Sequence, residues 1–144
     1  MLDLIIKNGQ CYIDGKLKVI DVSIKNGKIQ NIGKTSEEAK EIIDAKDLTV
    51  LPGCIDTQTH FREPGSTDTE DLHSGSRAAI VGGITAVFEM PNTNPPTSNK
   101  KEFQRKLDLA KNRMYCNYAF YFGATADNAN ELADLKNLEG CCGI

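Results

Sequence analysis

The chain has 144 residues and a formal net charge of −3, with 26% charged and 40% hydrophobic residues. This mildly acidic composition without a basic stripe argues against nucleic-acid binding, and no apolar run approaches the roughly 20 residues of a membrane helix. The first residues also lack the features of a signal peptide, so a cytoplasmic protein without nucleic-acid or membrane partners is expected.

Residues 1–50 are predicted to form a small antiparallel β unit. Three turn dipeptides, Asn8-Gly9, Asp14-Gly15 and Asn26-Gly27, are typical of hairpins because Gly, Asn and Asp tolerate positive φ. The runs between them are rich in strand-forming residues and are expected to be strands: 4–6, 11–13, 19–24, 28–32 and 42–43. Residues 34–41 are predicted to be a charged, exposed connection.

Residues 51–144 change rhythm, because strand-like and helix-like runs alternate. Strands are predicted within residues 52–65 and for residues 84–90, 117–122 and from residue 141. Three helices are predicted between them. The first has a capping box of Thr67 and Glu70 and ends at Gly82-Gly83, and Ser98 and Asp127 cap the others. This βαβαβαβ order predicts a parallel sheet with right-handed crossovers, in either a doubly wound sheet or a β/α barrel. No strand is followed by a glycine-rich dinucleotide fingerprint, which disfavours the first.

The strand predicted within residues 52–65 is polar on one face near its end. Alternation places Asp56, Gln58, His60 and Arg62 on the same side. Burying these groups is costly unless they bind something, and polar groups at the carboxyl ends of strands form the sites of barrel enzymes. Purely structural roles are also possible for these residues. His60 could be a hydrogen-bonded structural histidine, Arg62 could pair with Glu63 or Asp56, and Asp56 could cap a loop.

This strand, continuing into Phe61-Arg62-Glu63-Pro64-Gly65, and the later Met90-Pro91-Asn92-Thr93 resemble signatures of the amidohydrolase superfamily, and of its dihydroorotase branch in particular. The resemblance implies an α/β fold, the N-terminal part of a metal-dependent β/α (TIM-like) barrel preceded by a small β-sandwich. Residues 1–50 would then be sandwich strands, and residues 51–144 the first β/α units of an incomplete barrel.

The implied activity is the interconversion of N-carbamoyl-L-aspartate and L-dihydroorotate in pyrimidine biosynthesis, with one or two zinc ions. By resemblance His60 is a metal ligand, and Arg62 and Asn92 bind the substrate carboxylate, although Asn92 between two prolines also suits a simple turn. The catalytic residues are expected beyond residue 144, so this fragment alone is expected to be inactive. A small-molecule substrate and a homodimer of the full-length enzyme are also expected.

Gln58 departs from the family pattern, in which this position is the first metal-binding histidine. An amide is a poor zinc ligand beside imidazole, so the site could keep fewer metals, bind weakly through Gln58, or be dead. An active enzyme with an altered metal site is the favoured interpretation. Two alternatives remain open: a non-catalytic homologue that supports aspartate transcarbamoylase, and a hydantoinase- or allantoinase-like cyclic amidohydrolase.

Overall fold

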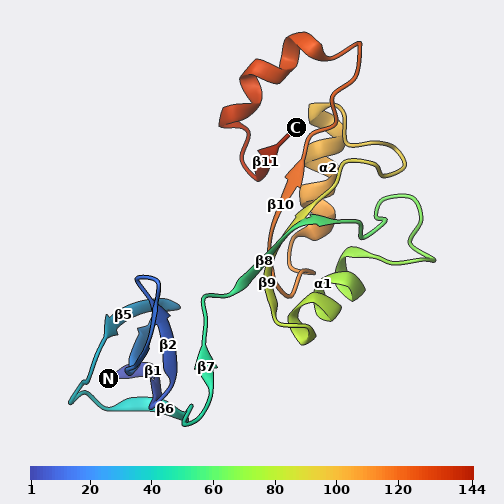
Figure 1. The fold of residues 1–144 in the computed structure, drawn as a ribbon. Coiled ribbons are helices and arrows are strands. Elements are labelled where there is room, and N and C mark those ends of the chain that lie inside the picture. Colours follow the sequence, from blue (N-terminus) through green and yellow to red (C-terminus); the bar gives the residue numbers. More distant parts are fainter. The chain divides into compact units, whose positions relative to one another are not determined.

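The computed structural model describes all 144 residues, which divide into two compact units, Met1–Pro52 and Gly53–Ile144 (Figure 1). The first unit contains only strands, and the second alternates strands with helices. The α/β class predicted from the sequence is therefore confirmed.

Two sheets form the first unit. The larger has the order β5-β4-β1-β6, built from β1 (Leu2–Lys7), β4 (Val22–Lys25), β5 (Lys28–Ile32) and β6 (Ala39–Asp44). The smaller has the order β3-β2-β7, built from β2 (Gln10–Ile13), β3 (Lys16–Val19) and β7 (Thr49–Val50). The small apolar core of this first unit consists of five buried side chains: Leu2, Ile5, Cys11, Val22 and Ala45.

Two of the three predicted hairpins are confirmed. Asp14-Gly15 joins β2 to β3 and Asn26-Gly27 joins β4 to β5, each with both residues at positive φ. The Asn8-Gly9 hairpin is wrong, because this dipeptide carries the chain from the larger sheet to the smaller one. The purely antiparallel unit is also wrong, since β1 pairs with β6 and β2 pairs with β7 in parallel.

The predicted single strand 19–24 is split into β3 and β4, because Ile20-Asp21 is a second crossing between the two sheets. The two crossings are bonded to each other: Asn8 N donates to Asp21 Oδ1 at 3.1 Å, and Ile20 N donates to Gly9 O at 3.2 Å. A Cβ at Gly9 would lie 2.6 Å from Val50 Cγ2, so this crossing requires glycine.

A four-stranded parallel sheet forms the second unit, with the order β11-β10-β9-β8. Its strands are β8 (Cys54–Thr59), β9 (Ile84–Glu89), β10 (Asn117–Tyr121) and β11 (Cys141–Gly143). The connections contain α1 (Leu72–Val81), α2 (Lys100–Ala110) and a 3₁₀ helix, η1 (Ala129–Asn137). The predicted βαβαβαβ order is thus observed, with a 3₁₀ helix in place of the third α-helix.

The helix boundaries agree only in part with the prediction. Helix α1 ends at Gly82 as expected, but it begins after Asp71 and not near Thr67. The Asp71 carboxylate accepts the Ser74 N–H at 2.6 Å and Ser74 Oγ accepts the Asp71 N–H at 3.2 Å, which forms the real capping box. Helix α2 is capped by Asn99 and not by Ser98, and the residue before η1 is Asn128, not Asp127.

The core of the second unit is largely aromatic. Phe103 of α2 packs on Phe120 and Phe122, with ring centroids 6.4 and 6.1 Å apart. All three side chains are fully buried, and each such burial contributes about 2–3 kcal/mol. The remaining members of the buried cluster are Phe61, Leu72, Val87, Ala110, Cys116 and Leu135. This core fastens α2 to the sheet, so α2 can present side chains to the carboxyl ends of the strands.

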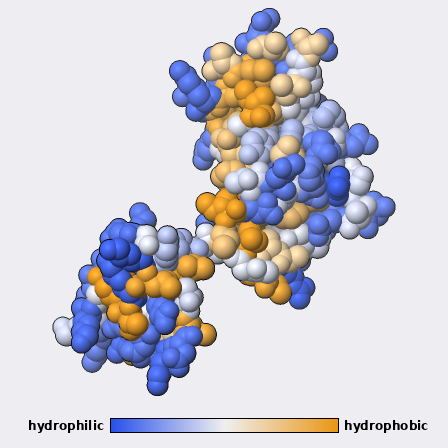
Figure 2. Space-filling model, in the orientation of Figure 1, coloured by the Kyte–Doolittle hydropathy of each residue, from blue (hydrophilic) through white to orange (hydrophobic).

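Apolar surface is also visible on each unit, drawn orange in Figure 2. Val19 of β3, Ile42 of β6, Ile55 of β8 and Val81 of α1 are more than half exposed. The sheet and helix faces that carry these residues are therefore only partly covered within this chain. Separately, none of its helices is long and apolar enough to cross a membrane.

Candidate active site

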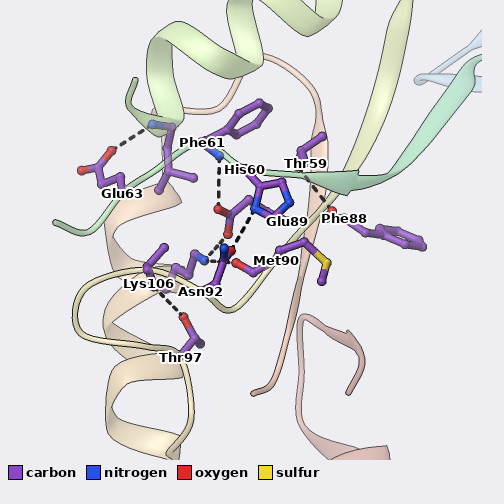
Figure 3. Close-up of polar contacts among 12 residues, drawn as sticks. Thr59, His60, Phe61, Glu63, Phe88, Glu89, Met90, Asn92, Thr97 and Lys106 are labelled. Atoms are coloured by element: carbon purple, nitrogen blue, oxygen red, sulfur yellow. Dashed lines mark hydrogen bonds and ion pairs between the residues drawn. The ribbon is translucent and has the colours of Figure 1, made fainter. Parts of the chain in front are cut away.

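Hydrogen bonds join strands β8 and β9 at their carboxyl ends. Met90 N donates to Thr59 O at 2.9 Å, and Thr59 Oγ1 donates to Phe88 O at 3.3 Å (Figure 3). Because the strands are parallel, the residues that follow them emerge at the same edge of the sheet. This arrangement brings His60, after β8, beside the loop after β9.

His60 and Asn92 are in direct contact at this edge. His60 Nδ1 lies 2.9 Å from Asn92 Oδ1 (Figure 3). An amide oxygen can only accept a hydrogen bond, so Nδ1 of a neutral His60 carries the proton and Nε2 keeps its lone pair. His60 is half-buried and Asn92 is exposed. The contact therefore prepares Nε2 of His60 as a ligand for a metal or a proton.

The other polar residues of β8 lie differently from the prediction, because the strand ends at Thr59 and not at Arg62. The β8–β9 register shifts between Asp56 and Thr59, which breaks the simple alternation. The Asp56 carboxylate accepts the N–H of Gln58 at 3.0 Å, so the cap interpretation of Asp56 is supported. Gln58 is exposed on the strand.

Arg62 lies in the loop after β8, in the left-handed region with φ of 61°. A non-glycine residue there is uncommon and turns the chain sharply, so Arg62 does not continue the row of the strand. Its side chain is exposed. Of the two carboxylates proposed as its structural partners, Glu63 is bound to Arg113 and Asp56 to the Gln58 backbone. The Arg62 guanidinium therefore pairs with neither Glu63 nor Asp56.

A buried ion pair, Glu89–Lys106, lies beneath the His60–Asn92 contact. The side chains of both residues are fully buried, and the Lys106 ammonium also lies 5.1 Å from the centroid of the Phe120 ring. Glu89 Oε1 accepts the Phe61 N–H at 3.3 Å, and Lys106 Nζ donates to Met90 O at 2.9 Å (Figure 3). Burial raises the pKa of the Glu89 carboxyl and lowers the pKa of the Lys106 ammonium, against the opposing effect of each on the other.

A second ion pair, Glu63–Arg113, holds the far end of the loop after β8. Arg113 Nη1 and Nη2 donate to the two Glu63 oxygens at 2.8 and 3.1 Å, and Leu72 N donates to Glu63 Oε2 at 2.9 Å. The hydrogen bonds to Glu63 raise the pKa of Arg113. The bidentate geometry is the strong form of this interaction. Both ends of the loop that carries Arg62 are therefore anchored.

Of the four predicted site residues, the structure brings two into contact, His60 and Asn92. Gln58 and Arg62 belong to the same segment, but neither side chain bonds to that pair. Sequence reasoning missed Lys106, although its spacing from Phe103 and Ala110 placed a lysine on the apolar face of α2. His73 is exposed, and its ring lies 3.2 Å from the Tyr115 hydroxyl.

The donor set at this edge fits part of a metal site. No three His, Cys, Asp or Glu side chains of this chain gather at one point. His60 offers an imidazole nitrogen in the correct tautomer, and the exposed amide of Gln58 offers a weaker oxygen donor. Residues of this chain therefore supply some, and not all, of the ligands that a zinc ion takes.

A parallel sheet built from β/α units, with polar side chains at the carboxyl ends of its strands, is the arrangement of β/α barrels and of doubly wound sheets. Comparison with known families makes this specific, because the model of the amidohydrolase family matches residues 49–140. The chain belongs to the amidohydrolase family, and the predicted superfamily is confirmed.

The curated relatives carry names within that family. An allantoinase of Salmonella choleraesuis (strain SC-B67) is 42% identical over 137 residues, which cover 94% of this chain and 30% of the allantoinase. An allantoinase of Escherichia coli (strain SMS-3-5 / SECEC) is 41% identical over the same length. The chain thus spans about a third of the length of these relatives.

Solved structures agree with this assignment. The L-hydantoinase (dihydropyrimidinase) from Arthrobacter aurescens matches 99% of this chain with a TM-score of 0.90 and 31% identity, over 32% of its own length. A D-hydantoinase matches 98% of the chain with a TM-score of 0.81 and 33% identity. The fold is therefore the N-terminal part of a β/α barrel with a β-rich first unit, as predicted, and these solved neighbours are hydantoinases. The relatives do not single out the dihydroorotase branch.

Proposed function

We propose that the protein acts as a metal-dependent hydrolase of cyclic amides, of the hydantoinase and allantoinase type. The observation that carries this proposal is the His60–Asn92 contact, which leaves an imidazole nitrogen free at the carboxyl edge of the sheet. The likeness to allantoinases and hydantoinases supports the ring-opening hydrolysis of a cyclic ureide over other amide substrates. It favours the hydantoinase-like alternative over the dihydroorotase interpretation.

His60 would hold the metal through Nε2, and Gln58 would contribute at most a weak amide oxygen. When bound, a zinc ion lowers the pKa of a coordinated water and polarises the ring carbonyl. Asn92 keeps the proton of His60 on Nδ1, which fixes the ring orientation. We propose that the remaining ligands and the general base come from outside the residues of this chain.

The direct test is an assay of the intact protein, purified with stoichiometric zinc, against hydantoin, allantoin and dihydroorotate. Ring opening of hydantoin or allantoin, lost on chelation and restored by zinc, is the expected result. His60→Gln should abolish this activity while leaving the fold intact by circular dichroism. Zinc-loaded, folded protein that opens none of the three rings would overturn the proposal.

Dihydroorotase activity remains the second candidate, and one observation favours it. The exposed Arg62 guanidinium is not engaged by Glu63 or Asp56, and Asn92 uses only its Oδ1 on His60, so both could donate to a substrate carboxylate. If so, Arg62→Met should lower kcat/KM for dihydroorotate by about 10- to 100-fold and leave hydantoin turnover within about twofold. Equal effects on both substrates would exclude a carboxylate-specific role.

Gln58 is tested by Gln58→His, which supplies the imidazole of the family pattern. We expect a higher zinc content per chain, because imidazole binds zinc better than a neutral amide. Unchanged zinc would count against an altered metal site. A protein that lacks zinc and turnover even with histidine at position 58 would favour the non-catalytic role beside aspartate transcarbamoylase. That partner and a homodimer remain proposals.

A further inference from the structure

The buried pair Glu89–Lys106 holds both strand ends that carry the His60–Asn92 contact. Glu89 Oε1 accepts the N–H of Phe61, the residue directly after His60. Lys106 Nζ donates to the carbonyl of Met90, two residues before Asn92. One buried ion pair is thus hydrogen-bonded to the backbone next to His60 and to the backbone next to Asn92.

Stability alone does not account for this pair. Replacing a buried ion pair by apolar side chains of similar volume is often neutral or stabilising, because desolvation offsets the attraction. An apolar pair between Val87, Phe103 and Phe120 would extend the existing core. Apolar side chains would offer no acceptor for Phe61 N and no donor for Met90 O. Both backbone groups lie just beyond the strand ends, where no neighbouring strand supplies a hydrogen-bond partner.

We propose that Glu89 and Lys106 form a positioning unit that sets the separation of His60 from Asn92 and thereby keeps the His60 proton on Nδ1. Its consequence for metal binding rests on the proposed function. The positioning itself concerns only residues of this chain and is measurable without metal. Both side chains are fully buried, so in this proposal they act through His60 and Asn92.

The decisive variant is the double substitution Glu89→Leu with Lys106→Met in the intact protein, which removes both charges at nearly constant volume. The readout is the ¹⁵N spectrum of the His60 ring in metal-free protein, which distinguishes the two neutral tautomers. We expect the single tautomer of the wild type to give way to a mixture of both. Zinc affinity, measured by competition with a chelator, should fall about 10- to 100-fold, the usual effect of lost support behind a ligand.

Two controls separate positioning from stability. Arg113→Met breaks the other ion pair of this segment, Glu63–Arg113, and should leave the His60 spectrum and zinc affinity unchanged. His73, which contacts the Tyr115 hydroxyl, is an internal reference whose ring signals should not move in any variant. The double variant loses the partners of Phe61 N and Met90 O, so its midpoint of thermal unfolding should fall, and both readouts are taken at a temperature where it is folded.

A double variant with the His60 tautomer and zinc affinity of the wild type would overturn the proposal. If that variant does not fold, Glu89→Gln with Lys106→Met decides, because it keeps an acceptor for Phe61 N and removes only the donor to Met90 O. A second His60 tautomer is expected in this variant, and a wild-type spectrum would also overturn the proposal. A wild type that binds no zinc would defeat the proposed function alone, since the tautomer is read without metal.

Discussion

Two ion pairs fasten the segment after β8 to the rest of the second unit, and they work in the same way at different depths. In each pair a glutamate accepts one backbone N–H of this segment, Phe61 N for Glu89 and Leu72 N for Glu63. Each glutamate is also paired with a cation from α2 or just beyond it. The pair at Lys106 is fully buried, whereas the Arg113 side chain is 36% exposed.

The difference in depth reverses the balance between desolvation and attraction. At Glu89–Lys106, burial is the larger effect, and it shifts the pKa of each group towards its neutral form. At Glu63–Arg113, the hydrogen bonds are the larger effect, and they raise the pKa of Arg113. The shallow pair is therefore a simple stabilising tie. The deep pair is costly to desolvate, and it also binds two backbone groups at the strand ends.

The largest expected effect comes from breaking the deep pair on one side. Lys106→Met leaves the Glu89 carboxylate buried without its cation, so the free energy of unfolding should fall by about 3–5 kcal/mol. Urea denaturation followed by circular dichroism measures this loss. If the free energy of unfolding falls by less than about 1 kcal/mol, the buried pair is no more sensitive to loss of its cation than the partly exposed pair is expected to be.

An intermediate effect is expected from Gly75→Ala in α1, which acts on the segment between the two pairs. A methyl group at position 75 would overlap the ring of Phe61, and overpacking of this kind costs about 1–3 kcal/mol. Gly82→Ala at the end of the same helix is the matched control, since its Cβ would meet only ordinary contacts near 3.4 Å. Equal unfolding midpoints for the two variants would contradict this expectation.

The shallow pair should cost less to break. Arg113→Met removes a partly exposed cation, and the expected loss is about 1 kcal/mol after allowance for solvent screening. Arg113→Lys should recover only part of it, because an ammonium cannot reproduce the bidentate geometry. Differential scanning calorimetry of the three proteins would show the order wild type, lysine, methionine. A methionine variant as unstable as Lys106→Met would remove the distinction between the pairs.

The smallest effect at neutral pH concerns Asp71, the N-cap of α1 next to the shallow pair. The Ser74 N–H lowers the pKa of the Asp71 carboxyl in the folded protein. The contribution of this group is therefore present above the unfolded pKa of about 3.9 and is lost as the pH falls through the folded value.

Asp71→Asn tests this, because asparagine caps helices equally well but does not titrate in this range. Stability at pH 7 should stay within about 0.5 kcal/mol of the wild type, and its decline below pH 4 should be shallower. Urea unfolding at a series of pH values measures both. Identical acid slopes would show that Asp71 contributes nothing to the pH dependence.

The elements that were predicted correctly depend on short-range chemistry. Asp14-Gly15 and Asn26-Gly27 make hairpins because their residues accept positive φ, and Gly82 ends α1 for similar local reasons. Where several residues could do the same local task, the prediction failed. Thr67 and Glu70 suit a capping box as well as Asp71 and Ser74 do, and the hydrogen bond from Leu72 N to Glu63, a long-range contact, accompanies the second pair.

The residues themselves determined the parallel β/α order of the second unit and the position of His60 at the end of its first strand, because alternation and periodicity are properties of neighbouring residues. Tertiary structure alone decided that His60 meets Asn92, 32 positions away, and that Glu89 pairs with Lys106. Such contacts depend on strand register and on the seating of α2 against the sheet. These are set by the sum of many long-range interactions, which no local pattern records.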